Sequence, residues 1–121
     1  MRPLVKVIDV AALRHNFQRL QQQAGVAALC AVVKADAYGH GVAHVLPALA
    51  DAASFAVASI DEALQLRQLG VMKPVLLLEG IFAPDEATLC AQHGFVPCVH
   101  SVEQLQWLRG VAGIFAWVKV D

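Results

Sequence analysis

The stretch SFAVASIDEALQLRQLG, residues 54–70, holds the signals for a strand and a helix in immediate succession. Its first part, SFAVAS, is a short apolar run of the kind that forms a buried strand. Ser59 and Glu62 follow it directly with the spacing of a capping box, which marks the start of a helix. Gly70 lies where that helix should end. The stretch therefore predicts one β/α unit.

The same pattern recurs along the chain. Strand-like runs end at about residues 34, 58, 78, 99 and 119, so they repeat at intervals of roughly 20 to 24 residues. Ser101 and Gln104 repeat the capping-box spacing, Pro84 begins another helix-start signal, and Gly94 and Gly110 stand at expected helix ends. Near-continuous apolar strands that alternate with helices indicate parallel strands buried on both faces. The strand-like runs are LCAVVK (29–34), SFAVAS (54–59), PVLLLEG (74–80), FVPCVH (95–100) and IFAWVKV (114–120).

The segment before this repeat has signals of its own. LVKVI, residues 4–8, predicts an opening strand. Asp9 can cap a helix that places Leu13, Phe17 and Leu20 on one face, and Gly25 lies just past its end. We therefore expect a strand and an amphipathic helix ahead of the repeat.

Two α/β folds fit such a repeat, a doubly wound sheet and a (β/α)8 barrel of the TIM type. The uniform short period and the absence of a GxGxxG turn after the first strand favour the barrel. A barrel needs eight units and about 250 residues, whereas this chain of 121 residues reaches only the fifth strand. We expect residues 1–121 to be the N-terminal part of a barrel domain, about five β/α units, with open strand edges that the missing strands would cover.

The composition argues against several classes of function. The formal net charge is −1 without a basic stripe, which gives no support to binding of nucleic acid or of an anionic membrane. Although 58% of the residues are hydrophobic, no apolar stretch approaches the roughly 20 residues of a membrane span. Charged residues interrupt the start of the chain, which argues against a signal peptide and predicts a cytoplasmic protein. The cysteines, Cys30, Cys90 and Cys98, form no CxxC pair and are expected to be reduced core residues.

One of the four lysines ends the first strand-like run, in AVVKADAYGHG, residues 31–41. Chemistry in (β/α)8 enzymes gathers at the C-terminal ends of the strands, so Lys34 is a candidate catalytic residue. A lysine that attacks an aldehyde must lose its proton, and burial at a barrel mouth favours the neutral amine. Backbone N–H groups of the glycine-flanked turn and the Tyr38 hydroxyl could reach a phosphate, so the stretch fits a pyridoxal phosphate site. On the residues alone, a lysine that only extends its stem along a strand end is the favoured interpretation.

The stretch AVVKADAYGHG also resembles the cofactor-lysine signature of alanine racemases, pyridoxal-phosphate enzymes built from a barrel and a following β domain. The likeness continues through residues 54–70, through VLLLEG and through the terminal WVKVD. It implies that Lys34 carries the Schiff base to pyridoxal 5'-phosphate and is one of two acid/base groups that move the α-proton of alanine. It further implies that Tyr38 helps to hold the phosphate, and that Lys119 matches a lysine that is carbamylated in some members.

The resemblance implies a partner as well. The second base of the family is a tyrosine from the C-terminal domain of the partner subunit, so the complete enzyme is expected to be a homodimer. That domain, and the arginines that contact the pyridine nitrogen and help to position the substrate carboxylate, lie outside the matched residues. Residues 1–121 alone are therefore expected not to racemise alanine at a useful rate. The complete bacterial enzyme would supply D-alanine for peptidoglycan precursors.

Other residues are weaker candidates. His40 and His44 have an i, i+4 spacing that can present two imidazoles to a metal, but no third ligand is evident and no metal site is predicted. Glu79 closes the third strand-like run on the same side as Lys34, where it either hydrogen-bonds the site or faces solvent. Phe115 and Trp117 alternate with Ala116 and Val118, a pattern that predicts core packing.

Two other functions stay open on the sequence alone. A single-domain relative of this barrel binds pyridoxal phosphate without clear turnover, so a non-catalytic pyridoxal-phosphate-binding barrel protein is the first alternative. A half-barrel without any ligand is the second. For that second alternative, open strand edges predict self-association or poor solubility.

Overall fold

The computed structural model describes residues 1–120, and its sheet has five parallel strands. These are β1 (Cys30–Val32), β2 (Ser54–Val57), β3 (Val75–Leu77), β4 (Phe95–Val99) and β5 (Trp117–Val118). Each strand pairs with the next one in the sequence, in the order β1-β2-β3-β4-β5. Strands of a TIM-type barrel pair in this way, so the described residues form part of such a barrel, as predicted.

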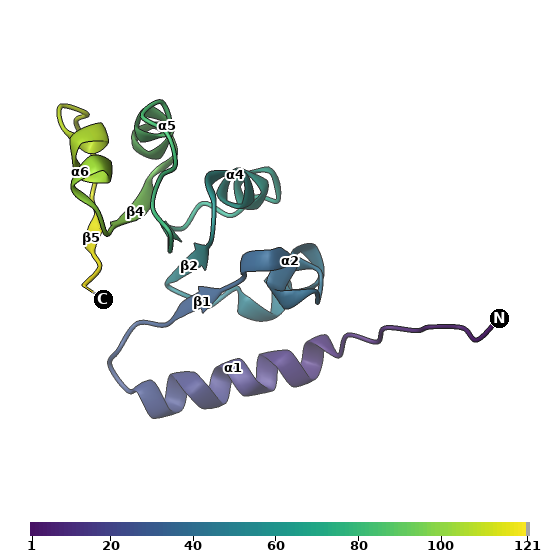
Figure 1. Cartoon of the computed structure of the whole chain (residues 1–121). Helices are drawn as coiled ribbons and strands as arrows, with labels where there is room; N and C mark the ends of the chain where they lie inside the picture. The colour runs from purple at the N-terminus through teal and green to yellow at the C-terminus, as the bar shows by residue number, and fades with distance from the viewer. Residues whose placement is uncertain (121) are drawn as a thin grey trace.

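Helices connect the strands and cover one side of the sheet. They are α1 (Val10–Ala24), α2 (Lys34–Tyr38), α3 (Val42–Val45), the 3-10 helix η1 (Leu46–Leu49), α4 (Ile60–Gln68), α5 (Glu86–His93) and α6 (Val102–Leu108). Figure 1 shows α4, α5 and α6 along the outer side of the strands, whereas α1, which precedes the repeat, packs against η1 and α3. None of the helices within residues 1–120 is long and apolar enough to cross a membrane.

The helices begin and end at the predicted signals. Ser59 accepts a hydrogen bond from the backbone N–H of Glu62 at the start of α4, and Ser101 accepts one from that of Gln104 at the start of α6. Asp9 caps α1 in the same manner. A glycine with positive φ follows the end of each of α1, α4, α5 and α6. The local helix signals of the sequence are therefore confirmed.

The core lies between the sheet and its helices. Successive side chains of a strand point to opposite faces, and the parallel register places Phe55, Val75 and Phe95 in one row. Each of the three is at most 3% exposed and belongs to the main apolar cluster. Full burial of such a side chain contributes about 1.5 to 3 kcal/mol. This row fixes the three central strands relative to the helices.

The other face of the sheet carries the next row of register partners, Val32, Ala56, Leu76 and Val96. Ala56 in a central strand is 1% exposed, whereas Val32 in the edge strand is 42% exposed. The sequence predicted burial on both faces, but this second face is buried only in part. The reason is that the helices cover the opposite face, so Leu76 and Val96 are also only half-buried although they lie in central strands.

The predicted opening strand at residues 4–8 is wrong, because these residues have no regular secondary structure. A strand needs a partner to complete its backbone hydrogen bonds, and no strand of the described chain lies beside this segment. It runs outward from α1 instead (Figure 1). The Nζ atom of Lys6 donates to the carbonyl of Gly39 at 2.7 Å, which ties the segment to the loop after α2.

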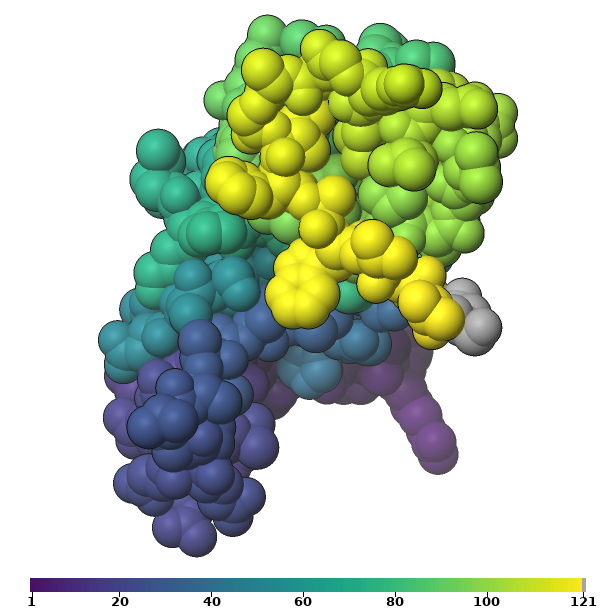
Figure 2. All heavy atoms as spheres, turned by 90° about the vertical axis from the view of Figure 1, so that its left-hand side faces the viewer, coloured from purple at the N-terminus to yellow at the C-terminus, as the bar shows by residue number. Residues whose placement is uncertain are grey.

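The predicted core packing of Phe115 and Trp117 is also wrong, since their side chains are 80% and 66% exposed. Figure 2 shows this C-terminal part of the chain, in yellow, at the surface of the molecule. β5 is an edge strand, so its side chains have neighbours on one side only. Cys90 and Cys98 are buried as expected, but Cys30, on the other edge strand, is exposed.

Candidate functional site

Lys34 lies just past the C-terminal end of β1, as the first residue of α2. All five strands are parallel, so their C-terminal ends share one edge of the sheet, which we call the rim. The Lys34 side chain is half-buried, and its amine makes no hydrogen bond or ion pair within residues 1–120. The structure thus places an unengaged amine on the rim.

The four residues after Lys34 form a left-handed helical turn. The φ angles of Ala35, Asp36, Ala37 and Tyr38 are 52°, 53°, 54° and 55°. This conformation costs about 1 to 2 kcal/mol for each residue other than glycine, or roughly 4 to 8 kcal/mol for the four residues of the turn. Contacts with the surrounding structure must offset that cost. The loop predicted from the sequence is therefore an ordered and strained turn.

Hydrogen bonds within the segment hold this turn. The N–H of Gly39 donates to the carbonyl of Ala35, and the N–H of Gly41 donates to that of Asp36, each at 2.9 Å. The Asp36 carboxylate accepts from the N–H of Val42 at 2.8 Å and so caps the start of α3. These backbone N–H groups are engaged within the protein, which contradicts the prediction that they could hold a phosphate.

The carboxylate of Glu62 connects α4 to the turn. Its Oε1 atom accepts from the N–H of Ala35 at 2.8 Å, and its Oε2 atom accepts from the N–H of Ala58 at 2.7 Å. The sequence predicts Glu62 only as the partner of Ser59 in a capping box. The contact with Ala35 spans 27 residues of sequence, and no local pattern could have revealed it.

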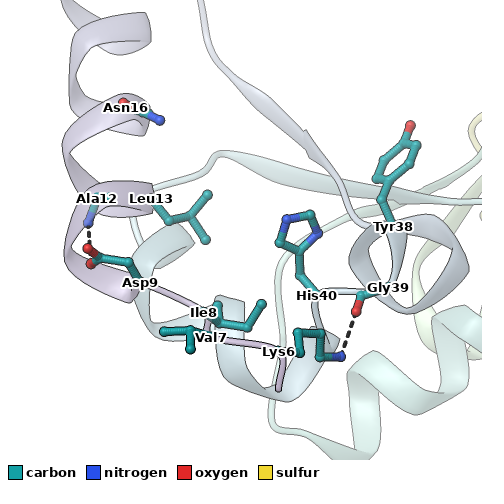
Figure 3. Close-up of a pocket in the computed structure, with 10 residues that line it drawn as sticks. All are labelled: Lys6, Val7, Ile8, Asp9, Ala12, Leu13, Asn16, Tyr38, Gly39 and His40. Atoms are coloured by element: carbon teal, nitrogen blue, oxygen red, sulfur yellow. Dashed lines mark hydrogen bonds between the residues drawn. The ribbon is translucent and has the colours of Figure 1, made fainter. Parts of the chain in front are cut away.

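Tyr38 ends the left-handed turn and projects from it. Its side chain is 61% exposed, and its hydroxyl makes no hydrogen bond within the described part of the chain. Figure 3 shows its ring pointing away from a hollow of about 490 Å³ between residues 6–9, α1 and the turn, whereas His40 points toward that hollow. The structure therefore brings Lys34 and Tyr38 together on one turn of the rim, with both polar ends unengaged among residues 1–120.

Lys119 follows β5 on the same rim, at the other edge of the sheet from Lys34. Its side chain is exposed, and its backbone N–H donates to the carbonyl of Val99 at 2.9 Å. Burial raises the pKa of the Cys98 thiol, and the nearby positive charge of Lys119 opposes that effect only in part. Lys119 thus lies on the rim after β5, whereas the turn that bears Tyr38 follows β1 at the opposite edge of the sheet.

The loop after β3 meets the rim through its backbone. The Nε2 atom of Gln104 donates to the carbonyls of Glu79 at 3.0 Å and Ile81 at 3.1 Å. Its Oε1 atom accepts from the N–H of His100 at 3.0 Å, and the Gln104 side chain is only 5% exposed. The Glu79 carboxylate makes no hydrogen bond within residues 1–120. The sequence singled out Glu79 in this loop but not the contacts of Gln104, whose long-range bonds leave no local signal.

His40 and His44 do not lie on one regular helix. His40 falls between α2 and α3, whereas His44 belongs to α3. The Nδ1 atom of His40 is 2.8 Å from the carbonyl of Ala37. Within residues 1–120, no group of three or more histidine, cysteine or acidic side chains could hold a metal ion.

Known proteins share this fold. Residues 8–121 match the family model for the N-terminal domain of alanine racemase. The chain belongs to the alanine racemase family. The alanine racemase of Dichelobacter nodosus (strain VCS1703A) is 48% identical over 122 residues, which cover all of this chain and 34% of that relative.

Solved structures of the alanine racemase family agree with this fold. The biosynthetic alanine racemase from Pseudomonas aeruginosa superposes with a TM-score of 0.92 at 39% identity, over all of this chain and 35% of that one. A histidine racemase from Leuconostoc mesenteroides subsp. sake NBRC 102480 superposes with a TM-score of 0.73 at 30% identity, over 82% of this chain and 27% of that one. The chain thus spans about a third of the length of the alanine racemases that it matches.

Proposed function

We propose that this chain is the N-terminal part of an alanine racemase, which interconverts L-alanine and D-alanine with pyridoxal 5'-phosphate as its cofactor. Membership of the family and 48% identity to a relative of that name support the reaction. One observation carries the proposal: an amine at a strand end of the partial barrel precedes a strained turn that bears a tyrosine. Strained backbone of this kind clusters at functional sites.

The residues of the rim fit this cofactor in two respects. The aldehyde of pyridoxal phosphate needs an amine, and the Lys34 amine has no competing partner within residues 1–120. The phosphate needs hydrogen-bond donors, and the exposed Tyr38 hydroxyl can supply one. The backbone N–H groups of Gly39, Gly41 and Val42 are engaged elsewhere, so other donors to the phosphate belong to residues beyond this part of the barrel.

When bound, the pyridine ring of the cofactor withdraws electron density from Cα of the amino acid and so makes the α-proton acidic. Lys34 is the residue that removes and returns this proton on one face of Cα. Tyr38 orients the bound group through its phosphate. Racemisation also needs an acid/base group on the opposite face. The family resemblance assigns that role to a tyrosine in the C-terminal domain of the partner subunit, so a homodimer is part of the proposal.

Lys119 has a separate proposed role. Its ammonium group would first lose a proton, and the neutral amine would then add carbon dioxide and release a second proton. A negative carbamate would thus replace the positive charge on the rim. The exposed position of the side chain at the end of β5 leaves room for this modification. Carbon NMR of the protein under isotopically labelled carbon dioxide tests it, and the absence of a carbamate signal that Lys119→Ala removes would contradict it.

Covalent trapping tests the role of Lys34. The purified chain is incubated with pyridoxal phosphate and reduced with borohydride, and the modified lysine is located by peptide mass mapping. We expect Lys34 to be labelled in preference to Lys6, Lys73 and Lys119. Lys34→Arg keeps the positive charge and is the matched control, which should lose the preferential label. Equal labelling of all four lysines would contradict the proposed cofactor site in this chain.

Activity separates the proposed enzyme from the two alternatives. In a longer protein that contains these residues and a C-terminal β domain, we expect racemisation of alanine that Lys34→Arg abolishes. Cofactor binding without racemisation would favour a non-catalytic pyridoxal-phosphate-binding barrel protein. A chain that binds no cofactor would favour a half-barrel without a ligand. We further propose that the complete enzyme acts in the bacterial cytoplasm and supplies D-alanine for peptidoglycan precursors.

A further inference from the structure

We propose that Glu62 is a positioning residue for Lys34, because its carboxylate holds the left-handed turn through the N–H of Ala35. This inference rests on the proposed function, which gives Lys34 its role. Glu62 itself touches neither the Lys34 amine nor any group that reacts. It acts through the backbone that carries Lys34.

Lys34 is held on both sides by the same neighbouring β/α unit. On one side, the N–H of Val33 donates to the carbonyl of Ala56 in β2 at 2.9 Å. On the other side, the N–H of Ala35 donates to Oε1 of Glu62 in α4 at 2.8 Å. The Lys34 backbone therefore lies between two bonded amides: that of Val33 is bonded to β2, and that of Ala35 is bonded to α4. Only the second of these bonds depends on a side chain.

The partners of Glu62 require a carboxylate. Both of its oxygens face N–H groups, those of Ala35 and Ala58, so both must accept hydrogen bonds. Charged acceptors make stronger hydrogen bonds to backbone amides than neutral ones. A glutamine of the same shape would present an NH₂ group to one of these two N–H groups. Its bond to Ala35 or its bond to Ala58 would then be lost.

Gln104 makes contacts of the same kind two β/α units further along the sheet, with the side-chain type changed to match its partners. Like Glu62, Gln104 follows a capping serine and accepts from the backbone N–H four residues before it, that of His100. Its other partners are two carbonyls of the loop after β3, so it needs an amide NH₂ instead of a second oxygen. In both units a side chain in the first turn of the helix binds the rim loop of the preceding strand. For Glu62, that loop is the turn after Lys34.

The turn needs such a contact because it is strained. Ala35 is the first of its four residues with positive φ, and none of the four is a glycine. Without the bond to Glu62, no other hydrogen bond within residues 1–120 holds the Ala35 N–H. We expect the turn to relax toward ordinary φ values, which would move the amine away from its working position.

Glu62→Gln tests this, with Asp61→Asn as the matched control. Asp61 is the neighbouring residue of the same helix turn, is exposed, and makes no side-chain hydrogen bond within residues 1–120. Both substitutions remove one negative charge from the start of α4, so they change its interaction with the helix dipole alike. Two quantities are measured in the chain: amide hydrogen exchange of residues 35–38, and preferential labelling of Lys34 by pyridoxal phosphate and borohydride.

For Glu62→Gln we expect exchange at residues 35–38 to become about tenfold faster and the preferential labelling of Lys34 to fall about tenfold, with Asp61→Asn close to the original chain. Unchanged exchange both in Glu62→Gln and in Glu62→Ala, which removes both acceptor oxygens, would overturn the proposal, because Glu62 would then not hold the turn. Faster exchange with unchanged labelling would also overturn it, because the role of Glu62 would be structural only. If the original chain shows no preference for Lys34, the proposed cofactor site fails, while the exchange result still decides whether Glu62 holds the turn.

Discussion

At the scale of single residues, the geometry of the rim depends on close packing at Gly80. Its φ is +75°, and a Cβ atom at this position would lie 2.2 Å from the carbonyl oxygen of Cys98 and 2.6 Å from Nε2 of Gln104. The backbone oxygen cannot move without shifting β4. Gly80 therefore allows the loop after β3 to pass close enough for Gln104 to bond the carbonyls on either side of it.

Gly80→Ala should destabilise the protein by about 3 kcal/mol or more, because the left-handed φ and the contact with a backbone oxygen both oppose the methyl group. Gly113→Ala is the control, since Gly113 has a similar φ of +81° but no atom within 4 Å of its Cβ position. It should cost only about 1 kcal/mol. Chemical denaturation measures both changes. Equal costs for the two variants would show that the close approach at Gly80 does not matter.

The candidate site could be predicted from the sequence only in part. Lys34 and Tyr38 stand in a short local stretch whose position at a strand end follows from the β/α repeat. Glu62 and Gln104 could be predicted as helix-start residues but not as contacts of the rim, because their partners lie 27 and 25 residues away in sequence. Hydrogen bonds between residues this far apart in sequence form only once the sheet has folded. A local pattern does not contain it.

At the scale of the elements, Arg67 near the end of α4 joins two loops at the edge of the sheet opposite the rim. Its guanidinium donates to the carbonyl of His93 at the end of α5, at 2.7 Å from Nη2. It also donates to the carbonyls of Val71 and Lys73 in the loop before β3, at 2.7 and 2.9 Å. The guanidinium carbon lies 5.0 Å from the ring centre of Phe95, a cation–π distance. Partial burial lowers the pKa of Arg67.

Arg67→Lys should therefore lower the free energy of unfolding by about 1 to 3 kcal/mol, since one ammonium group cannot reach all three carbonyls or stack on the ring. Arg109→Lys makes the same change on an exposed side chain without hydrogen bonds to residues 1–120, and it should stay within about 0.5 kcal/mol. Urea denaturation of both variants measures the difference. A loss in Arg67→Lys no larger than that in Arg109→Lys would contradict this role.

The sequence predicted the elements well where local chemistry decides them. Ser59 and Ser101 cap helices as their spacing indicates, and the strands fall within the apolar runs. The left-handed turn at residues 35–38 was missed because none of its residues is a glycine, so propensity argues against it. Residues 4–8 have the composition of a strand but lack a partner. Both misses concern segments whose conformation depends on distant parts of the fold.

At the scale of the whole molecule, the described sheet has two free edges, at β1 and at β5. Three apolar side chains on these edge strands are exposed: Val32 by 42%, Trp117 by 66% and Val118 by 77%. Unpaired strand edges with apolar side chains are templates for pairing with another chain. In a closed barrel, strands on either side would cover them. The open edges are therefore the part of this chain that is most prone to bind a second copy.

Self-association of the 121-residue chain is accordingly expected, and sedimentation velocity over a range of concentrations measures it. Trp117→Lys places a charge on the free edge strand, where the exposed indole now stands, and should weaken association about tenfold. Leu4→Lys is the control, because Leu4 is 99% exposed but lies in the N-terminal segment, away from both edges. A chain that stays monomeric at every concentration would contradict this expectation. Equal weakening by both substitutions would show that general hydrophobicity, and not the strand edge, drives the association.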